Sequence, residues 1–125
     1  MDVTELMVKG IVVGLFQENC WVIGSRRTRM GVVIDPGDEP ERILELARDL
    51  GVTVRYIINT HAHVDHIMAV PAVQRATGAR FLLHPGDQTL AAQAGQSAAR
   101  WLGRLVEPPP APDAPLQDGD VVEVD

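Results

Sequence analysis

The chain has a single cysteine, Cys20, and no uncharged apolar run that approaches the ~18 residues of a membrane span. One cysteine cannot form an intrachain disulfide, and nothing else in the sequence indicates an oxidising compartment. The first ten residues carry Asp2 and Glu5 where a secretory signal would carry positive charge. We therefore expect a cytoplasmic protein with no membrane partner, in which Cys20 is a buried strand thiol and not a nucleophile.

Positive charge is also scarce. Eleven lysines and arginines stand against 17 acidic residues, and the only basic cluster comprises Arg26, Arg27 and Arg29. Nucleic-acid binding draws most of its affinity from basic side chains that neutralise phosphates. The composition therefore disfavours a nucleic-acid partner and favours a small-molecule substrate.

The remaining composition is typical of one globular domain. The 125 residues are 46% apolar and 22% charged, which matches an ordinary globular protein. Short β-branched runs separated by glycine and polar residues predict strands in antiparallel hairpins. These runs cover residues 6–8, 11–16, 20–23 and 32–34.

The pattern then changes to alternating helices and strands. Asp38 and Glu41 form a capping-box pattern at the start of an amphipathic helix. In the second helix Pro71 would lie in or just after the first turn, where its missing N–H costs nothing. The β-α-β-α-β order predicts a parallel stretch of sheet and an α/β fold class. The predicted helices are residues 39–50 and 66–77, and the predicted strands are residues 54–59 and 81–83.

The last third carries weaker signals. Asp87 is placed to cap a short helix. Residues 107–115 (EPPPAPDAP), with Asp113 among them, are expected to be extended and solvated because prolines cannot donate to a ladder. A turn at residues 118–119 and a strand over residues 121–124 follow. A terminal strand without a partner predicts a fold that is incomplete at its C-terminal end and that exposes apolar surface for association.

Three of the four histidines lie in one short window, THAHVDHIM (residues 60–68), directly after a predicted buried strand. In extended backbone His61, His63 and Asp65 project from the same face, and His66 follows as the chain turns into a helix. The carboxyl end of a parallel strand is where open α/β sheets place their ligands. Four metal-ligating side chains can therefore converge at one edge of the sheet.

Imidazoles with a carboxylate suit zinc, and also iron or manganese. At these His and Asp frequencies H-x-H-x-D-H arises by chance in roughly one of a few thousand chains, so metal binding is favoured over histidines on a solvated loop. Four such ligands do not easily fit around one tetrahedral ion, so we expect His61 and His63 to hold one metal and Asp65 and His66 a second. Two ions would bind a hydroxide at neutral pH, and each would need further ligands.

The window resembles the signature of the metallo-β-lactamase fold superfamily. QENCWVIG (residues 17–24), VVIDPGDEPERI (residues 32–43) and LQDGDVVEVD (residues 116–125) are similar to stretches of its glyoxalase II-like (hydroxyacylglutathione hydrolase-like) branch. The resemblance covers nearly the whole chain. It implies the N-terminal part of a four-layer αβ/βα sandwich, with a mixed sheet, helices on one face and a dinuclear site at one edge.

The resemblance also implies roles for single residues. His61 and His63 correspond to ligands of a first zinc ion, and Asp65 and His66 correspond to ligands of a second. Asp65 is in addition the residue assigned to catalysis. Asp35, at the end of another strand, would hold the metal-binding loop by hydrogen bonds and tune the ligands without touching the metal.

The family's three further ligands, a histidine, a bridging aspartate and a final histidine, have little counterpart here. Only His84 remains, and we place it beside the site in a supporting or structural role, not as a ligand. We therefore expect residues 1–125 to be one domain that lacks part of its site and is inactive alone. We favour a longer chain that supplies the rest over a complement from another chain, and a homo-oligomer is a further option for the partner.

The implied activity is metal-dependent hydrolysis, with a glutathione thioester as the expected substrate and two zinc ions as the cofactor. One alternative is an oxidoreductase similar to the persulfide dioxygenases, which keep the histidine motif around a single iron. Another is a noncatalytic metal-binding fragment. The nuclease branch is disfavoured by the acidic charge and the absence of a basic stripe.

Overall fold

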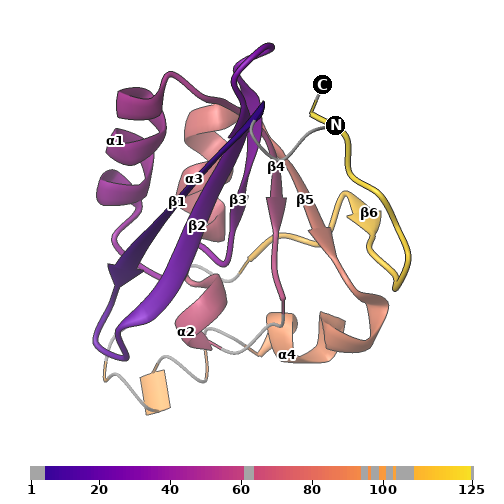
Figure 1. Cartoon of the computed structure of the whole chain (residues 1–125). Coiled ribbons are helices and arrows are strands. Elements are labelled where there is room, and N and C mark those ends of the chain that lie inside the picture. The colour runs from indigo at the N-terminus through magenta and orange to yellow at the C-terminus, as the bar shows by residue number, and fades with distance from the viewer. Residues whose placement is uncertain are drawn as a thin grey trace.

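The computed structural model describes residues 5–60, 64–93, 96, 99–100, 103 and 109–124, and within these ranges six strands form one sheet in chain order (Figure 1). The first three strands pair antiparallel and the last three join in parallel, so the predicted mixed α/β sheet is confirmed. The strands are β1 Leu6–Val13, β2 Glu18–Ser25, β3 Met30–Ile34, β4 Thr53–Ile58, β5 Arg80–Leu83 and β6 Ala114–Pro115. The helices are α1 Pro40–Leu50, α2 Val64–Ile67, α3 Val70–Thr77 and α4 Gln88–Ala92, with a 3-10 turn at Pro85–Asp87.

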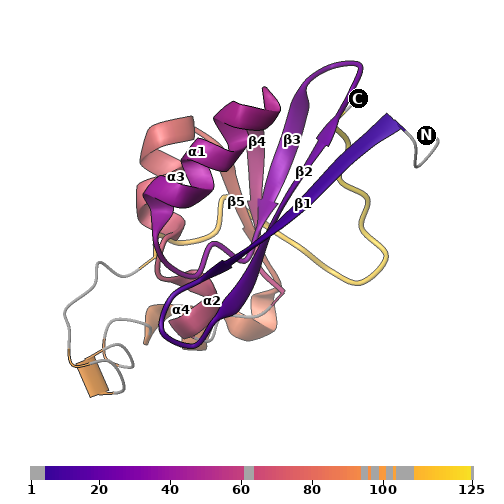
Figure 2. The ribbon, with the colours of Figure 1, turned by 60° about the vertical axis from the view of Figure 1, so that its left-hand side comes forward.

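Helices α1 and α3 cover one face of the sheet, and the C-terminal segment lies on the other (Figure 2). The covered face is apolar because alternate strand residues, which project toward the helices, are mostly apolar. The core includes Val22, Val33, Ile57 and Phe81 from the strands and Ile43, Ala47, Val70 and Val73 from the helices.

Among the described residues, none of the helices combines the length and apolar character that a bilayer crossing requires.

The first strand is longer than predicted. Residues 6–8 and 11–16 were expected as two strands, but β1 runs unbroken from Leu6 to Val13 and the chain then turns. Gly10 is tolerated inside it because the ring of Trp21, its partner on β2, covers the position; a Cβ at Gly10 would lie 2.7 Å from that ring. The aromatic side chain replaces the packing that glycine cannot provide.

The predicted capping box at the start of α1 is wrong. The residue that caps the helix is Glu39, in the left-handed region at φ 51°, and no side chain caps the helix. Asp38 Oδ1 instead accepts from the neighbouring Glu39 N–H at 2.8 Å. The Glu39 carboxylate accepts from Gly14 N–H at 2.9 Å and pairs with Arg42 at 3.1 Å. The start of α1 therefore holds the β1–β2 turn.

The single helix predicted over residues 66–77 is two helices. α2 ends at Ile67 and α3 begins at Val70, so Pro71 falls in the first turn of α3 as expected. A proline ring clashes with the carbonyl four residues earlier, here that of Ile67, so a straight helix through this point is disfavoured. The Ala69 N–H between the helices donates to the Pro36 carbonyl at 3.0 Å.

The described part of the proline-rich segment, residues 109–115, is exposed or half-buried as predicted, but its end also pairs with the sheet, which was not predicted. Ala114–Pro115 forms β6 beside β5, with Asp113 N–H donating to Phe81 O and Leu116 N–H to Leu83 O. Pro115 fits because β6 is an edge strand, where a missing donor is tolerated. Asp113 is exposed as predicted, and its carboxylate in addition accepts from Phe81 N–H at 2.7 Å and from Gln74 Nε2 at 2.9 Å.

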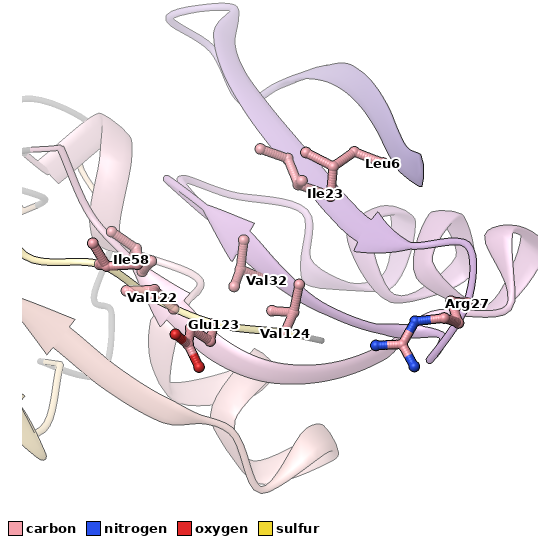
Figure 3. Close-up of a pocket in the computed structure, with 9 residues that line it drawn as sticks. Leu6, Ile23, Arg27, Val32, Ile58, Val122, Glu123 and Val124 are labelled. Carbon is pink, nitrogen blue, oxygen red and sulfur yellow. The ribbon is translucent and has the colours of Figure 1, made fainter. Parts of the chain in front are cut away.

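The predicted strand over residues 121–124 is absent, because these residues make no ladder. They cross the sheet face opposite the helices, where Thr28 Oγ1 donates to the Val124 carbonyl at 2.6 Å. Together with strand side chains they line a cavity of about 660 Å³ (Figure 3). The predicted turn is confirmed by the bond from Asp120 N–H to Gln117 O at 3.0 Å. The apolar strand side chains that line the cavity are Leu6, Ile23, Val32 and Ile58.

Candidate metal centre

Four short segments meet at one edge of the sheet. Parallel strands β3 and β4 end there, at Ile34 and Ile58, so Asp35 and Thr60 follow them closely, and antiparallel β2 begins there at Glu18. Helix α2, which carries His66, follows β4 after a few residues. The reversed direction of β2 therefore brings its first residue to the edge where open sheets place ligands.

Asp35 holds the end of β4 through both carboxylate oxygens. Its Oδ1 accepts from Thr60 N–H at 2.7 Å, and its Oδ2 accepts from Thr60 Oγ1 at 2.6 Å. The residue is 5% exposed and has φ 56°, the left-handed region that aspartate tolerates better than most side chains. Backbone strain of this kind collects at functional sites. Asp35 thereby fixes Thr60, the first residue of the histidine window.

His66 is held by the same carboxylate. Its Nδ1 lies 3.0 Å from Asp35 Oδ2 and 3.2 Å from Glu18 Oε1, and its backbone carbonyl accepts a hydrogen bond from Asn59 Nδ2. A hydrogen on Nδ1 that faces carboxylates leaves Nε2 as the ring's lone-pair atom. The donor chemistry of this cluster therefore fits a divalent metal on His66.

Glu18 is the member of the cluster that sequence reasoning missed. Its side chain is 2% exposed, and one of its oxygens lies within 4.8 Å of ligand atoms of Asp35 and His66. A signal was present, because Glu18 has the same strand parity as Cys20 and Val22, both fully buried. An acid at an inward-facing strand position indicates a buried partner.

Most of the predicted ligands lie outside what the structure describes. His61 and His63 fall between the described ranges, and only the backbone of Asp65 is described, in α2. Of the predicted site residues the structure brings together Asp35 and His66. His84 is exposed after β5, its Nδ1 accepts from Gly86 N–H at 2.9 Å, and it is not part of the group formed by Glu18, Asp35 and His66.

Cys20 is buried as expected, with 0% exposure. Burial raises the pKa of its thiol far above the ordinary value, and the nearby carboxylates of Glu18 and Asp35 raise it further. A thiol held in its protonated form is a poor nucleophile and a poor metal ligand. The chemistry of this edge therefore belongs to imidazole and carboxylate groups.

Comparison with known proteins gives a consistent picture. A family model described as the metallo-beta-lactamase superfamily matches residues 13–125. An uncharacterised protein of Aquifex aeolicus is 33% identical over 120 residues, which cover 95% of this chain and 55% of that protein. A hydroxyacylglutathione hydrolase of Anaeromyxobacter dehalogenans is 49% identical over 55 residues, 44% of this chain and 21% of that enzyme. The mitochondrial persulfide dioxygenase of Bos taurus is 34% identical over 84 residues, 65% of this chain and 30% of that enzyme.

A solved structure agrees with the fold. TTHA1623, crystallised in a di-iron-bound form, matches with a TM-score of 0.81 at 37% identity, over 92% of this chain and 57% of that chain. The chain thus spans about half the length of the Aquifex relative and of this structure, and less of the two named enzymes. The six-stranded mixed sheet corresponds to part of a larger fold in these proteins.

Proposed function

The chain belongs to the metallo-β-lactamase superfamily, and from this premise we propose that the protein is a metal-dependent hydrolase of small-molecule thioesters, with glutathione thioesters as the substrate class. The observation that carries the proposal is the 3.0 Å contact between His66 Nδ1 and Asp35 Oδ2. Metal-binding histidines almost always donate their other ring N–H to a carboxylate, a carbonyl or water. The 49% identity with a hydroxyacylglutathione hydrolase supports the substrate class.

In this proposal His61 and His63 hold one metal ion, and Asp65 and His66 hold a second, with Asp65 as the catalytic carboxylate. Zinc suits this donor set, and iron or manganese also fits; the di-iron form of TTHA1623 supports iron. A bound divalent ion would lower the pKa of a coordinated water toward ~7 and polarise the thioester carbonyl. Asp35 fixes Thr60 and His66 on either side of the ligand segment.

The site needs ligands that residues 1–125 do not supply, and we propose that a longer chain or a second chain supplies them. The lengths of the relatives support this view. The cavity opposite the helices is consistent with this view, because its lining includes the apolar strand side chains of Leu6, Ile23, Val32 and Ile58, which a further segment could cover. His84, beside the same edge, keeps a supporting or structural role, and the acidic protein acts in the cytoplasm on a small molecule.

A second candidate function rests on a different similarity. The 34% identity with the bovine persulfide dioxygenase favours an iron-dependent oxidoreductase at the same site. The two candidates differ in metal content and in the second substrate, because an oxygenase consumes O₂ and a hydrolase consumes water.

Elemental analysis of the full-length protein, paired with hydrolysis of a glutathione thioester, tests the proposal. We expect a stoichiometric divalent metal and turnover that Asp65→Asn abolishes, while Asp49→Asn, an exposed change on α1, leaves turnover intact. Stoichiometric iron with oxygen uptake and no hydrolysis would establish the oxidoreductase. A protein that stays metal-free when zinc and iron are supplied would remove both candidates.

A further inference from the structure

Glu18 is a buried acid on the face of the sheet that the helices cover. Apolar packing does not explain why a carboxylate lies there. It is the first residue of β2, pairs with Val13 of β1, and projects toward the helices together with Cys20. Its side chain is 2% exposed, and its Oε1 lies 3.2 Å from His66 Nδ1. Removing a carboxylate from water costs several kcal/mol unless a partner compensates. The residue therefore requires an electrostatic explanation.

The imidazole of His66 stands between two carboxylates. Its Nδ1 carries at most one hydrogen, and the shorter contact is the one to Asp35 at 3.0 Å. Asp35 is also fixed by two hydrogen bonds from Thr60, so it contacts the ring from a fixed position. The Glu18 carboxylate, at 3.2 Å from the same Nδ1, adds a second negative charge beside the ring.

This charge is not isolated from its surroundings. Burial raises the pKa of the Cys20 thiol, and the charges of Glu18 and Asp35 raise it further. Two buried carboxylates with one imidazole are most stable when positive charge lies nearby. A divalent ion on the far nitrogen of His66 would provide that charge.

Contacts between helix α1 and the β1–β2 turn fix the backbone just before Glu18. Arg42 of α1 donates to the Val12 carbonyl at 3.0 Å, and Glu39 accepts from Gly14 N–H at 2.9 Å, so the β1–β2 turn is fixed to the helix. Gln17, directly before Glu18, has φ 52°. Non-glycine residues in this region cost roughly 1 kcal/mol each, and they persist where the surrounding contacts determine the geometry.

We propose that Glu18 is a positioning residue of the metal centre. Together with Asp35 it keeps the hydrogen of His66 on Nδ1 and directs Nε2 to a divalent ion, and its negative charge increases the affinity for that ion. The proposal rests on the proposed function for the role of His66. It adds a residue of β2 to a site whose other described members follow β3 and β4.

The test uses Glu18→Gln, which keeps the shape of the side chain and removes its charge. In the full-length protein we expect zinc affinity, measured by competition with a chromophoric chelator, to fall 10–100-fold. Glu18→Asp is expected to recover part of that affinity. Glu45→Gln, the same change at an exposed position of α1, is the matched control and should leave affinity unchanged. Equal zinc affinity for Glu18→Gln and the parent protein would overturn the proposal.

A second measurement does not depend on the metal. In metal-free protein at pH 8, long-range ¹H–¹⁵N spectra of the histidine rings report which nitrogen of His66 carries the hydrogen. We expect the Nδ1–H form in the parent and a larger Nε2–H population in Glu18→Gln, because an amide can also donate to Nδ1. An unchanged ring would overturn the positioning role. A parent that binds no zinc but shows the tautomer shift would refute the proposed function and the affinity claim, and would leave Glu18 as the residue that sets the tautomer.

Discussion

His66 Nδ1 and Asp35 Oδ2 lie 3.0 Å apart although the two residues are 31 positions apart in the sequence. The same carboxylate accepts two hydrogen bonds from Thr60. One side chain therefore fixes the residues on both sides of the 61–65 segment, which contains the three remaining predicted ligands. This arrangement makes Asp35 the residue on which the geometry of the proposed site depends most.

Asp35→Asn should weaken both the fold and the site. An amide offers one acceptor oxygen in place of two, so at least one donor of Thr60 loses its partner, at a cost of about 1–3 kcal/mol. We expect a lower free energy of unfolding in urea and a 10–100-fold loss of zinc affinity. Asp49→Asn on the exposed side of α1 controls for the change in net charge. Unchanged stability and affinity would show that the Thr60 contacts are dispensable.

The proposed function predicts that residues 1–125 expressed alone bind zinc weakly and show negligible thioester turnover, because, of the further ligands that the family resemblance implies, only His84 remains among them. Chelator competition and a thioester assay beside the full-length protein measure both quantities. Size-exclusion chromatography during the assay identifies the active species. Robust catalysis by a monomer of residues 1–125 would contradict the expectation.

Gly31→Ala should destabilise the sheet severely. A Cβ at Gly31 would lie 2.3 Å from the Ile23 carbonyl oxygen and 2.6 Å from a Val52 methyl group. Overpacking of this kind costs about 1–3 kcal/mol or more, and thermal unfolding measures it. The double variant with Val52→Ala relieves only the methyl contact, so it should remain destabilised. Full recovery in the double variant would show that the backbone contact is harmless.

The buried thiol of Cys20 should make stability fall at alkaline pH. Burial raises its pKa in the folded state, so above roughly pH 8.5 the unfolded chain releases a proton that the folded chain keeps. The free energy of unfolding should then decrease by up to about 1.4 kcal/mol per pH unit from this group. Urea titrations at pH 8 and pH 10 measure the slope. Cys20→Ala should show a smaller slope, and an identical slope in both proteins would refute the assignment.

Asp113→Ala should release the proline-rich segment from β5. The variant loses the acceptor for the Phe81 N–H and for Gln74 Nε2. A buried donor without an acceptor lowers the free energy of unfolding by about 1–3 kcal/mol. Hydrogen exchange of the Phe81 amide should become faster. Asp118→Ala, in an exposed turn, serves as the control and should leave this amide protected.

Local patterns in the sequence were enough to predict most elements of the fold. The apolar stripe that includes Ile43 and Ala47 predicted a helix ending before Gly51, and the alternation of strands and helices predicted the parallel pairing of β3, β4 and β5. These features follow from residues close in sequence, whose periodicity reflects which side must face the core. The position of the histidine window after β4 was likewise readable, because a buried strand directly precedes it.

The sequence by itself therefore determined the fold class, the order of elements from β1 to β5 and the position of the histidine window after β4. Only the tertiary structure decided which polar groups meet: Glu18 beside His66, Glu39 on Gly14, and Asp113 on Phe81. Each carboxylate accepts from, or lies beside, a group at least 25 positions away in the chain. Such pairings depend on sheet order and strand direction, which bring distant residues within hydrogen-bonding distance. A local pattern of residues does not determine which distant residues these are.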